Sequence, residues 1–289
     1  MEYFVFADVS IDIDPAFARE HDVRYVSMDY MLGTDNCHCD RPESDEVMHR
    51  YYDQLRNKVP TQTSQITPYH YVSVFEPYVK KKQAILYLSL SSGLSNTYES
   101  AKMAVETLKE TFGEAEIEVV DSLGATGGMG LLMECACKNR AEGMPLKENA
   151  AWLRAHAAQV NYWFKVEDLM YLKRGGRISA ATAIMGTALN IRPILTIKGD
   201  GRLDTIAKKR GDKQAYRYMV EQFERTYDPS VCTIAYICCS DCLGQAEILK
   251  AMVLERHPEL TVRITMLSPI IGAHTGPDML SLIHFGETR

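Results

Sequence analysis

Ser91-Ser92-Gly93-Leu94-Ser95-Asn96-Thr97 is a hydroxyl-rich segment that separates two different kinds of element. The preceding residues, Ala84–Ser89, are short and mostly apolar, which predicts a buried strand. Beyond the segment, apolar residues recur at helical spacing from Ala101 to Phe112, which predicts a helix that begins near Thr97. A strand, a loop and a helix in this order are typical of a helix-flanked parallel sheet.

The same segment is a candidate anion site. Free backbone N–H groups and the positive end of a helix dipole favour a phosphate or a carboxylate at such a turn. The hydroxyls of Ser92, Ser95 and Thr97 add possible donors. The alternative is ordinary helix capping, because Ser, Thr and Asn are common at helix N-termini whatever the function. The segment alone leaves both interpretations open.

The first half of the chain alternates predicted strands and helices, which favours a parallel sheet with helices on its faces. In such sheets ligands collect beyond the carboxyl ends of the strands, where the loop after Ser89 lies. The predicted strands are Tyr3–Asp8, Ala84–Ser89 and Ala115–Val120, and the predicted helices are Glu43–Asn57, Thr97–Phe112, Thr126–Glu142 and Leu146–Gln159.

The second half has the pattern of a mixed sheet, including a hairpin at Gly199-Asp200-Gly201. We therefore predict an α/β protein of two domains that share a cleft: residues 1–160 with a helix-flanked parallel sheet, and residues 161–289 with a mixed sheet. The predicted strands here are Tyr162–Val166, Ile191–Lys198, Arg202–Lys208, Val231–Cys239, Val262–Leu267 and Met279–Phe285, and the helices are Asp212–Tyr227 and Leu243–Arg256.

Composition narrows the possible classes of function. The 289 residues are 46% hydrophobic and carry a formal charge of −6, with a pI near 5.8. An acidic chain argues against general nucleic-acid binding. No apolar run approaches the roughly 20 residues that span a bilayer. The N-terminus has no basic leader and resembles a first strand. We expect a cytoplasmic protein that does not span a membrane.

Eight cysteines in a chain of this length do not predict a disulfide scaffold. The clusters Cys37-His38-Cys39 and Cys239-Ser240-Asp241-Cys242 contain zinc-type ligands, but a four-ligand site would require the two clusters to meet. We therefore predict no metal. In the predicted strand Val231–Cys239, Cys232 would be buried as a small apolar side chain.

Two glycine-containing motifs have alternative interpretations. Gly124–Gly130 lacks the spacing of a dinucleotide-binding loop, which favours a closely packed turn from strand to helix. In Lys173–Ser179, Arg174 and Arg177 flank two glycines and offer planar groups suited to phosphate or carboxylate. A helix C-cap with solvated side chains is the alternative. Arg210 belongs to a second basic cluster with Lys208, Lys209 and Lys213.

The glycines around His274 predict a sharp turn between apolar runs that presents the imidazole at a site. Thr63 lies in another hydroxyl-rich loop, Thr61–Thr67. A nucleophilic interpretation would pair Ser95 with His274 and a carboxylate such as Asp121. No Gly-x-Ser-x-Gly elbow surrounds Ser95, which weakens that interpretation.

Four of these segments occur together and in order, and with them the whole chain resembles the bacterial DegV family, the fatty-acid-binding subunits of fatty acid kinase. The segments are Thr63-Ser64-Gln65, Ser91–Ala101, Tyr171–Ser179 and Ile271–Pro277. The resemblance implies two α/β domains with a fatty acid bound between them and its tail in the C-terminal domain. It also implies that Thr63, Ser95 and His274 hold the carboxylate, with a backbone N–H of Asn96 beside them.

The resemblance further implies a carrier with no ATP site and no cofactor of its own. A separate ATP-dependent kinase subunit would phosphorylate the bound long-chain fatty acid, giving acyl phosphate for phospholipid synthesis. Arg174, Arg177 and Arg210 would then contact the phosphate or the kinase. The chain departs from the family pattern at Ile66-Thr67, at Asn96 and at Val9-Ser10.

A long acyl chain needs an apolar tunnel, because each buried methylene contributes about 0.8 kcal/mol. The same residues would also make an ordinary core. Two other functions remain as alternatives: a Ser95/His274 acyl hydrolase or transferase, and a DNA-linked regulator that uses Arg174 and Arg177. The tunnel candidates in the second half are Phe164, Leu169, Ile184, Met185, Leu189 and Ile194.

Overall fold

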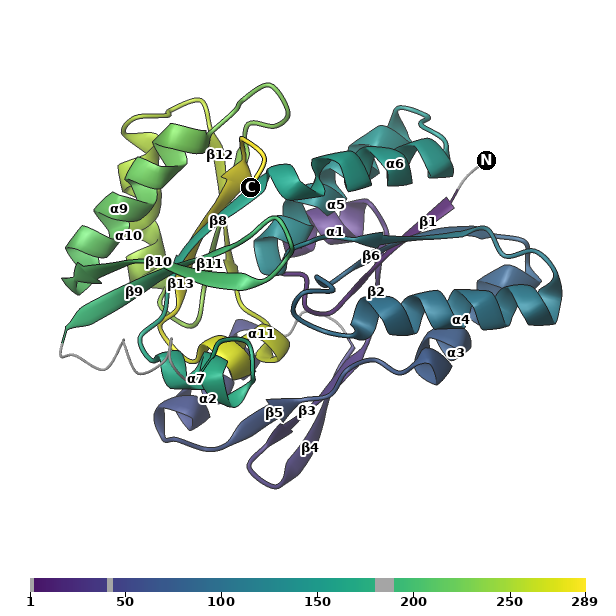
Figure 1. The fold of residues 1–289 in the computed structure, drawn as a ribbon, viewed down its shortest axis with the longest axis horizontal. Coiled ribbons are helices and arrows are strands. Elements are labelled where there is room, and N and C mark those ends of the chain that lie inside the picture. Colours follow the sequence, from purple (N-terminus) through teal and green to yellow (C-terminus); the bar gives the residue numbers. More distant parts are fainter. Residues whose placement is uncertain (1–2, 41–43, 180–189) are drawn as a thin grey trace.

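The computed structural model describes residues 3–40, 44–179 and 190–289, and two large sheets form its framework (Figure 1). The first sheet has the order β2-β1-β6-β7, and all of its strands are parallel. Its mostly apolar central strands are buried, as expected for a sheet with helices on both faces. The predicted parallel sheet is confirmed. Its strands are β1 (Tyr3–Asp8), β2 (Val23–Val26), β6 (Ala84–Ser89) and β7 (Ile117–Asp121).

The second sheet is mixed, as predicted, with the order β10-β9-β8-β13-β11-β12. Only β11 and β12 pair in parallel, and the other neighbours are antiparallel. Every strand of this sheet follows residue 159, and every strand of the first sheet precedes residue 122. The strands are β8 (Val160–Lys165), β9 (Ile191–Ile197), β10 (Leu203–Arg210), β11 (Ile234–Cys239), β12 (Thr261–Met266) and β13 (Leu280–Phe285).

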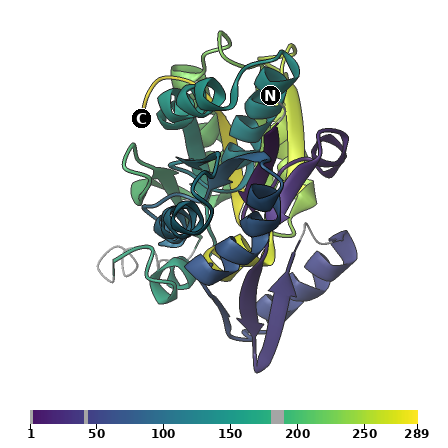
Figure 2. The ribbon, with the colours of Figure 1, turned by 90° about the vertical axis from the view of Figure 1, so that its right-hand side faces the viewer.

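Helices cover both sheets and fill the space between them (Figures 1 and 2). One face of the first sheet is covered by α3 (Pro68–Lys80) and α4 (Thr97–Phe112), and the other by α6 (Leu146–His156). The buried helix α5 (Thr126–Ala141) packs against β8, β11 and β13, while α9 (Gly211–Thr226) and α10 (Leu243–Leu254) cover the far face of the second sheet. One hydrophobic core therefore includes residues of both sheets.

A small antiparallel sheet, β4-β3-β5, projects from the first half beside α2 (Asp45–Arg56) (Figure 1). Its strands are β3 (Met28–Leu32), β4 (Asp35–Cys39) and β5 (Thr61–Thr63), and α1 (Pro15–Glu20) precedes it. The sequence analysis predicted α2, as the helix Glu43–Asn57, but not α1, α3 or these three strands, because the strands are short. The predicted loop Thr61–Thr67 was wrong in its first part, since β5 pairs with β3, and Thr67 caps α3.

Three further expectations need correction. The predicted sharp turn around His274 is the last turn of a helix, α11 (Pro269–Thr275), which ends at Gly276 with φ +74°. Proline at the first helical position and glycine after the last favour this short helix, which packs on α7 (Leu169–Arg174). Strand β11 begins at Ile234, so Cys232 precedes the strand and is partly exposed. The helix predicted to reach Gln159 ends at His156, and a 3-10 turn (Ala157–Gln159) follows.

Close packing explains the glycines of Gly124–Gly130, as the sequence predicts. A Cβ at Gly124 or Gly128 would lie about 2 Å from the hydroxyl of Tyr162. A Cβ at Gly127 would lie 2.7 Å from Tyr236 Cβ. Helix α5 therefore approaches the second sheet at a distance that only glycine permits.

Asp8 connects the ends of β1 and β6. Its fully buried carboxylate accepts hydrogen bonds from the N–H and hydroxyl of Ser10, from the Tyr87 hydroxyl at 3.0 Å and from the Leu90 N–H at 2.8 Å. Burial raises the pKa of Asp8, and these donors oppose the rise. Leu90 immediately precedes the Ser91–Thr97 loop, so Asp8 fixes the start of that loop.

We expect Asp8→Asn to lower the free energy of unfolding by about 1–3 kcal/mol, because the new amide cannot accept all of these hydrogen bonds. Urea denaturation followed by circular dichroism would measure the loss. Glu247→Gln, at an exposed position on α10, is the control and should leave the urea midpoint unchanged. Equal midpoints for the two variants would contradict the structural role of Asp8.

Candidate functional site

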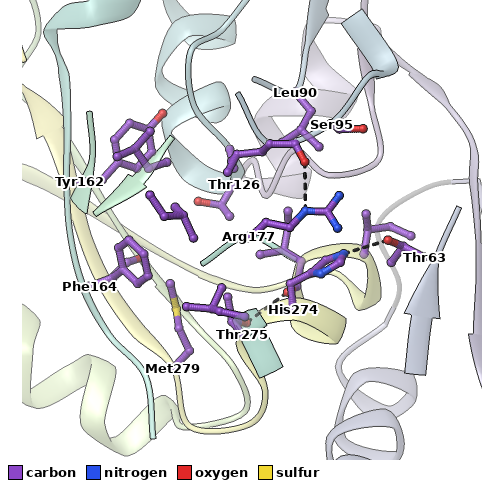
Figure 3. Close-up of a pocket in the computed structure, with 18 of the residues that line it drawn as sticks. Thr63, Leu90, Ser95, Thr126, Tyr162, Phe164, Arg177, His274, Thr275 and Met279 are labelled. Atoms are coloured by element: carbon purple, nitrogen blue, oxygen red, sulfur yellow. Dashed lines mark hydrogen bonds between the residues drawn. The ribbon is translucent and has the colours of Figure 1, made fainter. Parts of the chain in front are cut away.

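A cavity of about 260 Å3 lies beyond the carboxyl ends of β6 and β7, where the first sheet faces the second (Figure 3). Its polar end is formed by Thr63, Ser95, Arg177 and His274. The opposite wall is aromatic and apolar, as Figure 3 shows for Tyr162, Phe164 and Met279. Both halves of the chain contribute to the wall, and the cavity lies where the sequence analysis expects ligands to collect, beyond the carboxyl ends of the strands.

The Ser91–Thr97 loop forms one side of the cavity and contacts the second sheet. The Ser91 hydroxyl donates to the carbonyl oxygen of Gly201 at 2.9 Å, in the turn between β9 and β10. The Asp121 carboxylate accepts from the Ser92 N–H at 3.2 Å. These bonds hold the loop between the two sheets.

Ser95 has a capping role and also lines the cavity. Its Oγ lies 2.8 Å from Thr97 Oγ1 and accepts from the Thr97 N–H at 3.3 Å. The side chain of Asn96 makes no capping bond to α4, although Asn96 also lines the cavity. The same arrangement of the loop can therefore cap the helix and present Ser95 to a ligand.

His274 is a partly buried titratable group at the polar end. Its Nε2 lies 2.8 Å from Thr63 Oγ1, across the contact between α11 and β5 (Figure 3). Burial, together with the nearby charge of Arg177, lowers the pKa of His274 to about 4, so the imidazole is neutral at pH 7. Among the residues that the structure describes, its Nδ1 has no hydrogen-bond partner, and it packs against Gly175, where a Cβ would lie 2.1 Å away.

Arg177 brings a positive charge to the same end. Its Nε donates to the carbonyl oxygen of Leu94 at 3.0 Å, and the guanidinium also bonds the carbonyl of Gly175. Burial lowers the pKa of Arg177, and no carboxylate within the described ranges forms an ion pair with it. A half-buried cation of this kind favours an anion in the cavity.

A second cavity, of about 440 Å3, adjoins the first beyond His274 and Arg177. Lys58 and Arg174 line it, and the exposed Arg174 guanidinium lies 4.5 Å from the centre of the Tyr171 ring. Basic groups thus continue outward from the polar end of the first cavity.

The structure brings most of the predicted polar residues together. Thr63, Ser95, Asn96 and His274 all line the first cavity, as does Arg177, and Arg174 lines the second. Arg210 does not lie there. It ends β10, seven residues beyond Leu203 in the cavity wall, which is about 23 Å along a strand.

Of the predicted tunnel residues that the structure describes, only Phe164 lines the first cavity. Phe164 lines the cavity, but Leu169 and Ile194 belong to the packed core and not to its wall. Ile184, Met185 and Leu189 lie outside the described residues. Tyr162 was missed, although its spacing of two from Phe164 on β8 places both on one face of the strand. Ser281 and Ile283, paired with these residues from β13, were missed too and share the same signal.

The catalytic-triad arrangement is not assembled. Ser95 Oγ pairs with Thr97, and His274 Nε2 pairs with Thr63. Asp121 accepts from the N–H groups of Ser92 and Leu123 instead of orienting the imidazole. This geometry lacks the hydrogen bond from nucleophile to base, and from base to carboxylate, that a triad uses.

Two further findings concern the part of the chain that the structure describes. None of its helices has the length and apolar character needed to cross a membrane. None of its His, Cys, Asp and Glu side chains form a group of three arranged to hold a metal ion.

A comparison with protein families shows to which family the chain belongs. The profile of the DegV family, whose members it describes as uncharacterised proteins, matches residues 3–287. The chain belongs to the DegV family. A DegV domain-containing protein of Clostridium perfringens is 33% identical over 290 residues, covering 100% of this chain and 99% of its own length.

Solved structures of DegV-family members share the fold. A Thermus thermophilus member, described as fatty-acid-binding, is 26% identical with a TM-score of 0.84, covering 99% of this chain and all of its own. The B3 protein of Streptococcus pneumoniae fatty acid kinase, solved with linoleic acid, is 19% identical with a TM-score of 0.86 at the same coverage. The similarity to the Streptococcus pneumoniae structure shows that the two proteins share the two-sheet fold.

The lowered pKa of His274 predicts a pH-dependent stability. Burial also lowers the pKa of His284 to about 4, from the ordinary 6.5. Between pH 6.5 and pH 4 the unfolded chain therefore binds protons that the folded chain does not, so the free energy of unfolding should fall as the pH falls through this window.

Urea midpoints measured from pH 7 to pH 4 would test this expectation. His274→Gln should show a smaller loss of stability over the same window, because the contribution of His274 is then absent. An unchanged pH dependence in His274→Gln would contradict the assignment of a neutral buried imidazole at position 274.

Proposed function

We propose that this protein binds a long-chain fatty acid, with the carboxylate at the polar end of the first cavity and the tail along its apolar wall. The observation that carries the proposal is the division of one cavity into two ends. Hydroxyl, imidazole and guanidinium groups meet at one end, and Tyr162, Phe164 and Met279 line the other. The family membership and the fatty-acid-binding Thermus relative support it.

The carboxylate would be held by a chain of hydrogen bonds that begins at His274. With its proton on Nε2, the neutral imidazole donates to Thr63 Oγ1, which leaves the hydroxyl hydrogen of Thr63 free for a ligand oxygen. Ser95 and the N–H of Asn96 supply further donors from the adjoining loop. Arg177 supplies the compensating charge, without which burial of a carboxylate is costly.

The acyl tail would pass the start of α5 and the face of β8 that carries Tyr162 and Phe164. Each methylene removed from water there contributes about 0.8 kcal/mol, so even a short segment of tail outweighs the loss of one hydrogen bond. The departures at Ile66 and Asn96 are close in sequence to Thr63 and Ser95 and therefore bear on which fatty acid is preferred.

Under this proposal the protein is a carrier and not a catalyst. A separate ATP-dependent kinase phosphorylates the bound carboxylate, and the acyl phosphate serves phospholipid synthesis in the cytoplasm. The basic side chains of the second cavity, Lys58 and Arg174, would contact the incoming phosphate or the kinase. Arg210, on the distant end of β10, would serve only in docking the kinase.

We expect purified protein to retain a long-chain fatty acid, which denaturing extraction and mass spectrometry would identify. Thr63→Ala and Ser95→Ala should each weaken the binding of added fatty acid by about 1–3 kcal/mol, because each removes a donor from a charged group. Isothermal titration would measure the change. Ser92→Ala, an exposed hydroxyl of the same loop, is the matched control and should bind normally.

The retention experiment would refute binding if extraction repeatedly yields no acyl chain and the protein takes up no added fatty acid. Normal binding by Thr63→Ala or Ser95→Ala would remove that residue from the carboxylate site. The Thr63 variant also needs a folding check, because Thr63 belongs to β5 and not to a loop.

His274→Ala separates a carrier from an acyl hydrolase. For a carrier we expect weaker binding, less acyl phosphate when a kinase is supplied, and no ester hydrolysis by either form. If His274 were instead a general base, its loss would lower the rate of ester hydrolysis by several orders of magnitude and leave fatty acid binding largely intact. Turnover of a chromogenic ester that requires both Ser95 and His274 would overturn the carrier proposal.

A further inference from the structure

A row of side chains crosses four neighbouring strands of the second sheet and lines the first cavity. Ile197 on β9 pairs with Leu203 on β10, and Tyr162 on β8 pairs with Ile283 on β13. Continued by two residues from Phe164, the antiparallel register of β8 and β9 places Tyr162 opposite Ile197. Side chains that lie opposite each other share one face of a sheet. These four residues, all of which line the cavity, are called the end row here.

The end row lies away from the polar groups of the cavity. The carboxyl end of β8 leads toward α7, which Arg177 follows and on which α11 packs with His274. Tyr162 precedes Phe164 by two residues, so it lies about 7 Å farther from that end of β8. Figure 3 likewise shows Tyr162 on the side of the cavity opposite Thr63. A tail that starts at the polar end would therefore meet the end row last.

Arg289 supports the end row from outside the cavity. Its guanidinium carbon lies 5.0 Å from the centre of the Tyr162 ring, a distance typical of a cation–π contact. Its Nη1 donates to the carbonyl oxygen of Ile197 at 3.0 Å. Tyr162 and Ile197 line the cavity, whereas Arg289 is not among the described residues that do so. The guanidinium thus lies behind two members of the end row.

The same guanidinium joins the end row to two other segments of chain. Its Nη2 donates to the carbonyl oxygens of Leu123 at 3.1 Å and Ala157 at 2.9 Å, and its Nε donates to that of Ala158 at 3.3 Å. Leu123 precedes α5, and the two alanines lie in the turn between α6 and β8. The planar guanidinium can reach all of these carbonyls because its five N–H donors point in fixed, diverging directions, which the ammonium of a lysine cannot reproduce.

We propose that Tyr162, held in place by Arg289, is the end stop for the fatty acid tail and sets the longest acyl chain that the protein accepts. The inference rests on the proposed function, because it concerns the tail of the same ligand. The ring has little room to move, since its hydroxyl packs against Gly124 and Gly128 and the guanidinium lies beside it. Arg289 is a positioning residue, because it contacts the ring and not the tail.

The test compares dissociation constants of the full chain for saturated fatty acids that increase in length by steps of two carbons. Tyr162→Ala should extend the preferred length by about two carbons and tighten the binding of the longer acid by about tenfold, because the added methylenes can then be buried. Arg289→Ala should shift the preferred length in the same direction by less, because the ring remains but loses its support. A merely structural role of Arg289 would weaken the binding of all lengths alike.

Phe164→Ala is the matched control, since it removes another aromatic ring from the same face of β8, nearer to the polar end. It should change the affinity for all lengths alike, because every tail passes this position, and leave the preferred length unchanged. Circular dichroism checks that each variant is folded. Tyr162→Leu and Arg289→Lys replace the alanine variants if these are not folded, and each should shift the preferred length in the same direction.

The outcomes separate this inference from the proposed function. If the wild-type protein binds fatty acids and the variants at Tyr162 and Arg289 keep its preferred length, the end stop is refuted and the proposed function stands. An equal shift in Phe164→Ala would also overturn the end stop, because the effect would not depend on the position of the ring. If the wild-type protein binds no fatty acid of any length, the proposed function is refuted, and this inference with it.

Discussion

The contact between two loop backbones, at Gly93 and Gly201, determines how the two sheets enclose the cavity. A Cβ at Gly93 would lie 2.6 Å from the carbonyl carbon of Gly201, and the Ser91 hydroxyl bonds the Gly201 carbonyl oxygen. This contact holds the Ser91–Thr97 loop against the hairpin of β9 and β10. The positions of Ser95 and Asn96 relative to the second sheet depend on it.

The electrostatics of the polar end follow from the same enclosure. Burial keeps His274 neutral, and the charge of Arg177 has the same effect on its pKa. A neutral imidazole can donate one hydrogen bond and accept another, whereas a protonated one would place a second buried cation beside Arg177. One guanidinium charge at this end matches one carboxylate, which is the charge balance that the proposed ligand requires.

The sequence was sufficient for the parts of the fold with strong periodicity. The strand–loop–helix unit around Ser91–Thr97 is present as expected, and so is the mixed second sheet. Its failures lie in short or polar segments, whose structure hydrophobic periodicity does not reveal. Thr61–Thr63 becomes a strand because β3 offers an edge, and His274 enters a helix because Pro269 and Gly276 bound a single short segment.

The polar end of the cavity could be predicted from the sequence better than the apolar end. Hydroxyl, histidine and arginine side chains are conspicuous in a sequence, so the polar end was anticipated. Apolar side chains that line a cavity have the same pattern as those that fill a core, and only the folded arrangement separates Phe164 in the wall from Ile194 in the core. Ile194 pairs with Lys165, the neighbour of Phe164, so the side chains of Ile194 and Phe164 lie on opposite faces of the second sheet. On the cavity face, the glycines of α5 let Tyr162 pack against the helix backbone. The apolar end thus depends on residues that have no side chain, and for that reason the composition of the chain could not disclose it.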